Sequence, residues 1–274
     1  MTGLPPPSLT YRMEDGLRLG VLLWRFGPGW RMISSAMLGG GVGRREWVLN
    51  AQVAAGYSRM DPVEHMDALG PGGPGVGMMT AALVDRYAVA ADGGAEAVAT
   101  VGLGVPTWAA SPEGVPDPGV PAASEPGRKA GEESGREPAQ EDVTPATARA
   151  VAGLVAPEPG RETVGAGDAG ACVPRRAAPR PGTINILVAV PVAFSDPALV
   201  NAVMTVTEAK TQALLDAGFP CTGTASDAVC VAVREDGPAE AFGGPRSVWG
   251  ARIARAVHRA VLDGARDWRA RRAG

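Results

Sequence analysis

Among the residues that can do chemistry, one lysine stands out, because this chain carries almost all of its positive charge on arginine. Only two of its 26 basic residues are lysines, Lys129 and Lys210. Arginine keeps its proton at neutral pH, whereas a lysine removed from water can lose it and act as a base. Lys210 ends the stretch TVTEAK at residues 205–210, the densest group of reactive side chains in the chain. We therefore take this stretch as the first candidate for catalysis.

The stretch lies within a helix predicted over residues 197–217, which sets the direction of each side chain. At 100° per residue, Lys210 and Thr207 fall among apolar residues, and Glu208 falls at the boundary with the polar side. Lys210 is either a side chain whose stem covers the core and whose amine reaches water, or a partly desolvated base or cation. Glu208 is either a plain surface carboxylate or a general acid or base. The two are two residues apart, so they do not pair on this helix.

Two clusters of small polar residues offer further chemistry. The loop TGTASD at residues 222–227 can hold an oxyanion or a phosphate with its backbone N–H groups, and Asp227 can orient a water molecule. The alternative is a plain polar turn. Ser34 and Ser35 precede a glycine run, where a serine is a candidate nucleophile. The alternative there is a pair of strand-end hydroxyls bonded to the backbone.

Composition and motifs exclude several classes of protein. The formal net charge of −3 gives no field that attracts nucleic acid or an anionic membrane. The best apolar run, over residues 184–194, is about half as long as a membrane-spanning helix. The glycine patterns at 70–75 and 165–170 neither follow a strand nor open a helix, so no dinucleotide site is expected. Two histidines, and three cysteines without ligand spacing, predict no zinc site.

The same features predict a cytoplasmic protein. An odd set of three cysteines indicates a reducing compartment, and residues 1–16 lack the apolar core of a signal peptide. The residues imply no cofactor. A carboxylate-bound divalent cation stays open, as does the oligomeric state.

The elements that must position these clusters alternate between strands and helices. Strands are predicted at 17–26, 31–37, 47–53, 95–103, 183–192 and 227–234, and helices at 61–70, 197–217 and 248–270. Residues 78–84 fit either form. Strand, helix, strand, helix in the second half implies a parallel crossover. We therefore predict an α/β fold, with a layered mixed sheet and flanking helices.

One long segment differs from the rest in composition. Residues 111–181 hold 12 of the 25 prolines, no aromatic residue and a single leucine. Such a segment buries too little apolar surface to offset the entropy lost on ordering. We therefore predict a long disordered insertion at 111–181. It interrupts one domain, formed by residues 10–110 and 182–274.

Seven short stretches, in this order along the chain, resemble the adenosylcobinamide amidohydrolase (CbiZ) family. They are ISSA with its glycine run from residue 33, VLNAQV from 48, GMMTAA from 77, TVGL from 100, GTINI from 182, TVTEAK from 205 and TGTASDAV from 222. They cover both parts of the predicted domain and include the three clusters above. Ser226 stands where the family is expected to have threonine, a change that keeps the hydroxyl. The insertion departs from the family in length and composition, at a variable connection.

The resemblance implies a function and a substrate. Members of this family hydrolyse the amide that joins the corrin propionyl side chain to aminopropanol in adenosylcobinamide. The product, adenosylcobyric acid, re-enters cobalamin synthesis, so the enzyme serves salvage. The implied partner is a small corrinoid, and neither nucleic acid nor a membrane. The alternative is a corrinoid-binding protein without catalysis, which would not need Glu208 or Lys210.

Two schemes for amide hydrolysis stay open, because the reaction needs an attacking oxygen, a proton donor for the amine and a group that stabilises the oxyanion. In one scheme, Glu208 or Asp227 activates water, and Lys210 or the backbone N–H at Thr224 stabilises the oxyanion. In the other, Ser35 is a covalent nucleophile and Lys210 is its base. The side chains expected to bind substrate around them are Ser34, Asn50, Thr183, Asn185, Thr207, Thr222 and Thr224.

Overall fold

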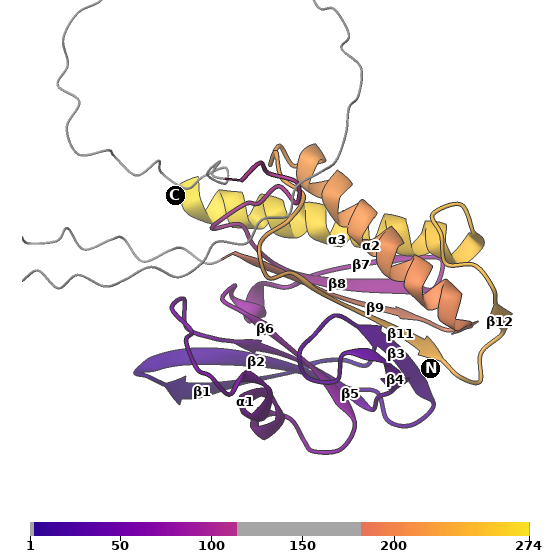
Figure 1. The fold of residues 1–274 in the computed structure, drawn as a ribbon, viewed down its shortest axis with the longest axis horizontal. Helices are drawn as coiled ribbons and strands as arrows, with labels where there is room; N and C mark the ends of the chain where they lie inside the picture. Colours follow the sequence, from indigo (N-terminus) through magenta and orange to yellow (C-terminus); the bar gives the residue numbers. More distant parts are fainter. Residues whose placement is uncertain (1–2, 114–181, 274) are drawn as a thin grey trace, which may run out of the picture. The chain divides into compact units, whose positions relative to one another are not determined.

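Two β-sheets face each other between helices in the computed structural model of the chain, which describes residues 3–113 and 182–273 (Figure 1). The layers, in order, are helix α1 (Pro62–Leu69), a four-stranded sheet, a six-stranded sheet, and helices α2 (Asp196–Asp216) and α3 (Val248–Ala273). The predicted α/β fold with flanking helices is confirmed, and its strands form two large sheets.

The four-stranded sheet has the order β1-β2-β5-β6. Its strands are β1 (Ser8–Glu14), β2 (Leu17–Arg25), β5 (Trp47–Gln52) and β6 (Gly75–Thr80). β5 and β6 are parallel and α1 connects them, whereas the other neighbours are antiparallel. Leu49 and Ala51 on the outer face of β5 pack with Met66 of α1, because alternate strand residues point to opposite faces.

The six-stranded sheet has the order β4-β3-β11-β9-β8-β7. Its strands are β3 (Trp30–Ser34), β4 (Gly41–Arg44), β7 (Ala88–Asp92), β8 (Ala95–Gly102), β9 (Thr183–Val190) and β11 (Ala228–Arg234). β9 and β11 are parallel and α2 joins them, which is the crossover that the sequence predicts. The short strands β10 (Ala193–Phe194) and β12 (Ala239–Glu240) form a separate parallel pair, and a 3-10 turn spans Val84–Arg86.

Strand β9 lies at the centre of the fold and is buried on both faces. Ile186 and Val188 pack against the helices, and Leu187 and Ala189 pack against the four-stranded sheet. A strand covered on both sides needs apolar residues at successive positions, which accounts for the apolar run over its last five residues, 186–190. Near its start, Asn185 takes the position facing the other sheet. The polar site is built at this end of the strand.

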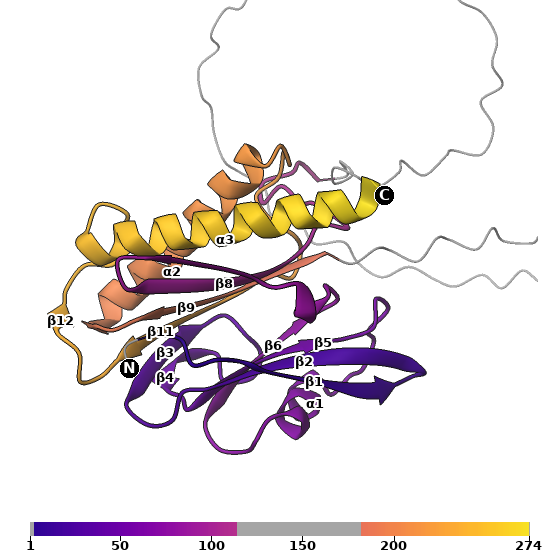
Figure 2. The ribbon, with the colours of Figure 1, turned by 180° about the vertical axis from the view of Figure 1, so that it is seen from behind.

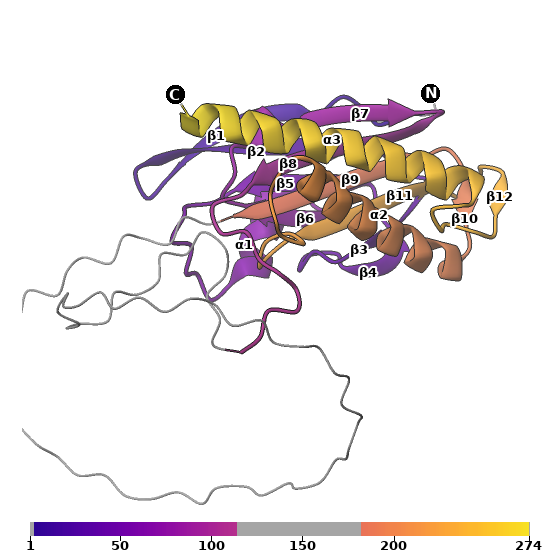
Figure 3. The ribbon, with the colours of Figure 1, turned by 90° about the horizontal axis from the view of Figure 1, so that it is seen from above.

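The two long helices cover the outer face of the six-stranded sheet (Figure 2 and Figure 3). α3 lies over β7 and β8, and α2 contacts α3 and β11. Ile253, Val257 and Val261 of α3 are fully buried, as their spacing predicts. The hydroxyl of Ser195 caps α2 by accepting a hydrogen bond from the backbone N–H of Ala198.

The predicted orientation of α2 is wrong at two threonines. Thr207 is exposed, and its hydroxyl bonds back to the carbonyl of Val203 at 3.0 Å. At 100° per residue Thr205 falls on the polar side of the helix, yet it is buried and donates to the carbonyl of Gly243 at 3.0 Å. The buried stripe of the helix is centred on alanines, which allow close packing and give little signal in a helical projection.

Several strands differ from the sequence prediction. The turn at residues 27–29 carries the chain from β2 to β3, which lie in different sheets. The strand predicted at 31–37 ends at Ser34, and residues 78–80 are the end of β6. β1, β4 and β7 were not predicted. All three lie at sheet edges with many exposed side chains, so they lack the apolar alternation of a covered strand.

The predicted disordered insertion lies outside the described residues from residue 114 to residue 181. By internal contacts the chain divides into two units, Met1–Ala122 with Ala177–Gly274, and Ala123–Arg176. The second unit lies wholly outside the described residues. Within the described ranges, no helix is long and apolar enough to cross a membrane.

Candidate functional site

A cavity of about 470 Å³ lies where strand ends of the two sheets come together. Its apolar lining residues are Ala36, Met37, Val53, Ala54, Ala55, Gly77, Met78, Met79, Ala81 and Ala228. Its polar lining residues are Ser35, Tyr57, Thr80, Thr183, Ser226 and Asp227. A largely apolar cavity with a few convergent polar groups is the usual form of a small-molecule site.

The two serines that follow β3 have different surroundings. Ser34 is buried, and its hydroxyl donates to the carbonyl of Val229 at 2.9 Å and accepts from the N–H of Ala36 at 3.1 Å. Ser35 is exposed at the cavity, and its oxygen accepts from the N–H of Val229 at 3.0 Å. Both hydroxyls therefore fix the end of β3 to β11. That bond leaves the O–H hydrogen of Ser35 available as a donor beside the cavity that Ser35 lines.

Asp227 is held at the cavity wall by four hydrogen bonds. Its Oδ2 accepts from Lys210 Nζ at 2.5 Å and from the N–H of Thr224 at 3.1 Å. Its Oδ1 accepts from the hydroxyl of Thr224 at 2.5 Å and from the N–H of Ile184 at 2.9 Å. A carboxylate offers about four acceptor sites, so these donors fill it.

Lys210 forms a shielded ion pair with Asp227. The two side chains are 9% and 10% exposed, so little water screens their attraction. Gly223 makes the approach possible, because a Cβ there would collide with both Lys210 Nζ and Asp227 Oδ2. The prediction that Lys210 points toward the core is confirmed. Its amine lies behind the cavity and acts on it through Asp227.

Hydroxyl groups continue the wall beside Asp227. Thr183 Oγ1 and Ser226 Oγ are 2.8 Å apart, and Ser226 also donates to the carbonyl of Gly182 at 3.4 Å. On the other sheet, the hydroxyl of Thr80 accepts from the N–H of Ala82 at 2.9 Å. Strands of both sheets thus present hydroxyls to one cavity.

A buried amide network lies between the two sheets behind the cavity. Asn50 donates to the hydroxyl of Thr100 at 3.0 Å. Asn185 donates to Asn50 Oδ1 at 2.9 Å and to the carbonyl of Met79 at 2.8 Å. Met79 lines the cavity, so the network holds this part of the wall in place. Asn50 and Asn185 support the wall and do not line it.

Three of the predicted site residues lie away from the cavity. Thr207 and Glu208 are on the exposed side of α2. Thr222 ties its loop to another, since its hydroxyl donates to the carbonyl of Thr107 at 3.1 Å and accepts from the N–H of Ala109 at 2.8 Å. The structure thus brings Ser35, Thr183 and Asp227 to the cavity, with Lys210, Thr224 and Ser34 behind them.

Glu208 lines a different hollow, a groove of about 390 Å³ between α2 and α3. Its lining residues are Thr205, Glu208, Ala209, Gln212, Pro245, Ala254, Arg255, His258 and Arg259. The His258 side chain is 23% exposed and bonds through Nε2 to Asp216 at 2.8 Å.

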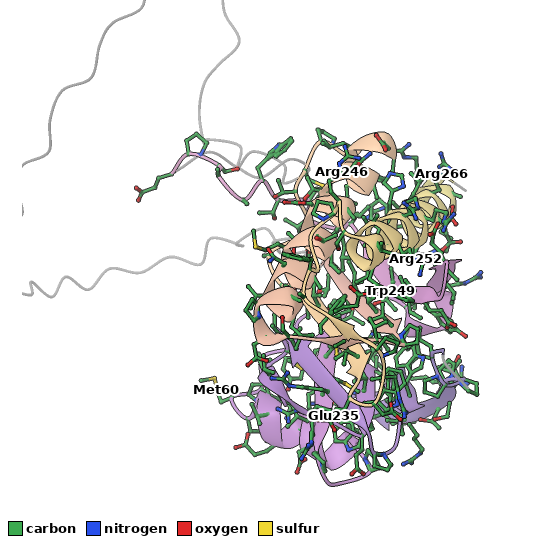
Figure 4. All side chains as sticks on the ribbon, turned by 90° about the vertical axis from the view of Figure 1, so that its right-hand side faces the viewer. Met60, Glu235, Arg246, Trp249, Arg252 and Arg266 are labelled. Carbon is green, nitrogen blue, oxygen red and sulfur yellow. The ribbon has the colours of Figure 1, made fainter. Side chains whose placement is uncertain are left out.

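The two arginines of the groove form ion pairs with an aspartate at the end of β7. Arg255 and Arg259 both bind Asp92, and the hydrogen bond from Arg255 is the main cause that lowers the pKa of Asp92. On the same helix, Arg252 stacks over Trp249 at 4.5 Å, where α3 begins (Figure 4). The groove therefore carries charges that largely neutralise one another.

Tyr57, which the sequence analysis missed, lies at the cavity in the loop between β5 and α1. Its hydroxyl is 2.9 Å from Nδ1 of the buried His65. His65 Nε2 is 3.4 Å from Glu14 Oε2 at the end of β1. Burial is the main cause that raises the pKa of Tyr57. The signal that points to Tyr57 is its place after the carboxyl end of a parallel strand, where α/β folds put their binding loops.

Exposed methionines border the same region. Met37 lines the cavity and is 56% exposed. Met60, in the loop of Tyr57, is 96% exposed and projects away from the fold (Figure 4). Such flexible and polarisable side chains adapt to large apolar ligands.

No group of three or more His, Cys, Asp and Glu side chains within residues 3–113 and 182–273 is placed to hold a metal ion. Cys221 and Cys230 are buried free thiols. Burial is the main cause that raises the pKa of both, and it raises the pKa of Cys230 to about 12. Neither is placed as a nucleophile of the cavity.

A comparison with protein families matches the chain over almost its whole length. The matching family is described as adenosylcobinamide amidohydrolase (CbiZ), and the match covers residues 7–131 and 134–273. No curated protein matches the chain. The matched ranges contain every residue that lines the cavity. The chain therefore belongs to the adenosylcobinamide amidohydrolase family.

Proposed function

We propose that this protein hydrolyses the amide between the corrin propionyl side chain and aminopropanol in adenosylcobinamide. The products are aminopropanol and adenosylcobyric acid, which serves cobalamin salvage in the cytoplasm. The observation that carries the proposal is the cavity, in a chain of this family, at which Ser35, Thr183 and Asp227 meet from distant parts of the sequence.

The size of the cavity suggests which part of the substrate it takes. A drug-sized ligand fills about 300–1,000 Å³, and a corrinoid with its adenosyl group is much larger than such a ligand. A cavity of about 470 Å³ therefore accepts the amide-bearing arm and leaves the ring outside. Met37 at the cavity, and Met60 in the loop that carries Tyr57, offer apolar contact to the corrin ring.

Of the two schemes for hydrolysis, the geometry favours attack by water. Lys210 is bonded to Asp227 and lies behind the cavity wall, so it is poorly placed as a base for Ser35. The Ser35 oxygen is held by the N–H of Val229, with its own hydrogen available to a bound molecule. A hydroxyl fixed in this way stabilises the carbonyl oxygen as it becomes an oxyanion.

In this scheme, Asp227 is a positioning residue. Its acceptor sites are filled by Lys210, Thr224 and Ile184, so it can take a proton from water only after losing one of these bonds. It holds the loop at residues 222–227, and with it the Ser226–Thr183 pair, at the cavity wall. Glu208, which lines the groove between α2 and α3, takes no part in the hydrolysis.

Incubation of the purified protein with adenosylcobinamide in ¹⁸O-labelled water tests the proposal. We expect equal amounts of aminopropanol and adenosylcobyric acid, with the label in the new carboxylate. No cofactor is proposed, so treatment with a chelator should leave the rate unchanged. Tight binding without product would identify a corrinoid-binding protein instead. An acyl group trapped on Ser35 and detected by mass spectrometry would refute attack by water.

A further inference from the structure

We propose that Tyr57, His65 and Glu14 form a proton relay for the hydrolysis, an inference that rests on the proposed function. Tyr57 lines the cavity, His65 lies behind it on α1, and Glu14 lies behind His65 at the end of β1. Three separate segments of the chain therefore bring a hydroxyl, an imidazole and a carboxylate together, with the hydroxyl-bearing residue at the cavity wall.

The contacts fix the role of each group. The Tyr57 hydroxyl lies 2.9 Å from His65 Nδ1, and the two rings stack with an interplanar angle of 10°. Glu14 lies 3.4 Å from His65 Nε2 and is itself held by Arg12 at 2.6 Å. A carboxylate beside Nε2 favours the tautomer with the hydrogen on Nε2, which leaves Nδ1 to accept from Tyr57. The tyrosine oxygen then keeps its lone pairs available to a molecule bound in the cavity that Tyr57 lines.

The relay accepts one proton and later returns it. As the water oxygen bonds to the amide carbon, a water hydrogen passes to the Tyr57 oxygen, and the hydroxyl hydrogen of Tyr57 passes to His65 Nδ1. The carbonyl electron pair becomes the oxyanion, and Glu14 balances the charge of the imidazolium. When the C–N bond breaks, the oxyanion pair re-forms C=O. The amine nitrogen takes its proton from Tyr57, and Tyr57 recovers one from His65.

Other groups at the cavity are less suited to this task. Asp227 already accepts four hydrogen bonds. Of the two histidines of the chain, His65 contacts a cavity residue, and His258 lines the groove between the helices. Burial raises the pKa of Tyr57, so the phenol keeps its proton near neutral pH and transmits protons without becoming an anion.

Charged groups of both signs surround the relay. Glu14 and Arg12 approach from β1, and Asp61 and Arg59 from the start of α1. The hydrogen bond from Arg59 lowers the pKa of Asp61 to about 2, so Asp61 stays ionised. The two carboxylates and the two guanidinium groups are equal in number and opposite in charge. Glu14, the carboxylate beside Nε2, is therefore the group that balances a positive charge formed on His65 during the reaction.

Paired variants test the relay with adenosylcobinamide as substrate. Tyr57→Phe and His65→Gln should each lower kcat by about 100-fold or more, with little change in corrinoid binding. The double variant should lose no more than either single one, because both act in one step. Tyr11→Phe is the matched control, since the Tyr11 hydroxyl bonds Asp85 at 3.3 Å, away from the cavity.

A second substrate separates loss of the relay from loss of the fold. The 4-nitrophenyl ester of adenosylcobyric acid has a leaving group that needs no proton, and hydroxylamine attacks without a base. With the ester as substrate and hydroxylamine as nucleophile, the Tyr57→Phe and His65→Gln variants should approach the wild-type rate. Misfolded variants would be slow with both substrates, and that result would overturn the inference that these residues act in proton transfer.

The outcomes distinguish the relay from the proposed function. If the wild type hydrolyses adenosylcobinamide and Tyr57→Phe keeps kcat within about twofold with an unchanged pH profile, the relay is wrong and the amidohydrolase stands. If the wild type binds adenosylcobinamide and releases no aminopropanol, the proposed function is wrong and the relay falls with it.

Discussion

The cavity between the sheets and the groove between α2 and α3 take charged residues from the same short stretch of helix, yet they differ in burial. Lys210 turns toward the cavity and pairs with Asp227, and both side chains are about one tenth exposed. Glu208, two residues away, turns to the groove, where Arg255 and Arg259 are 57% and 47% exposed. A dense group of reactive residues in a sequence therefore does not define one site. The direction in which each side chain points decides to which site the residue belongs.

Removal of the buried cation of Lys210 should have the largest effect on stability. It tests the difference between the cavity and the groove most directly. Lys210→Met leaves the Asp227 carboxylate shielded and unpaired, which should lower the free energy of unfolding by about 3–5 kcal/mol. Glu208→Gln, the matched change in the groove, should cost no more than about 0.5 kcal/mol. Denaturation by urea measures both. Equal losses would show that the two regions do not differ in this way.

The pair can also be removed as a unit. Lys210→Met combined with Asp227→Asn should regain part of the stability lost in the single variant, because no buried charge is then left alone. A double variant as unstable as the sum of the two single variants would argue that Lys210 and Asp227 are not coupled.

The second largest effect is expected in activity, at Ser35, the serine that lines the cavity. Ser35→Ala removes the hydroxyl proposed to face the oxyanion, and kcat should fall by about 100-fold. Ser34→Ala removes a buried hydroxyl that bonds the backbone, so it should mainly lower stability, by about 1–3 kcal/mol. Steady-state kinetics and thermal unfolding separate the two. Full activity of Ser35→Ala would place the oxyanion elsewhere.

A smaller effect is expected in the groove, and in stability alone. The pKa of Asp92 is lowered, chiefly by the hydrogen bond from Arg255, so its contribution to stability is complete above the ordinary pKa of aspartate. That contribution is lost as the pH falls through the lowered value. Asp92→Asn should therefore reduce stability slightly at neutral pH and flatten its decline in acid, with kcat unchanged. A loss of kcat would connect the groove to catalysis.

The smallest effect is an expected lack of reaction at two thiols. Cys221 and Cys230 are buried, and burial raises the pKa of each thiol. In a Cys172→Ser background, both should resist a thiol reagent at pH 8 until the protein unfolds. Rapid labelling of Cys221 alone would show that the loop holding Asp227 opens in solution, and would sharpen the contrast with the rigid sheet around Cys230.

The sequence predicts best those elements that are covered on both faces. The apolar run of β9 and the periodic apolar face of α3 both result from burial, and both elements lie where the sequence predicts them. The edge strands β1, β4 and β7 escape the same reasoning, because exposed side chains carry no such pattern. The division into two sheets cannot be predicted in this way either. The sequence of a turn such as 27–29 does not show whether it joins strands of one sheet or of two.

The candidate site is predictable only in part, for a similar reason. Helical geometry places Lys210 toward the core, but it cannot name Asp227 as its partner, which belongs to a loop after the helix. Tyr57, His65 and Glu14 are each unremarkable in the sequence. They come together only when the end of β1, helix α1 and the loop that carries Tyr57 pack against one another.

The order of strands in the six-stranded sheet has a consequence for how the protein is made. β3, β4, β7 and β8 come from the first part of the chain, and β9 and β11, which lie between β3 and β8, come from the last part. While the ribosome makes the intervening residues, the early strands must wait with unpaired edges. A chain cut within 114–181 should therefore give two fragments that fold only together. Because the entropy of closing a loop grows only with the logarithm of its length, additions at this one point cost the sheet little.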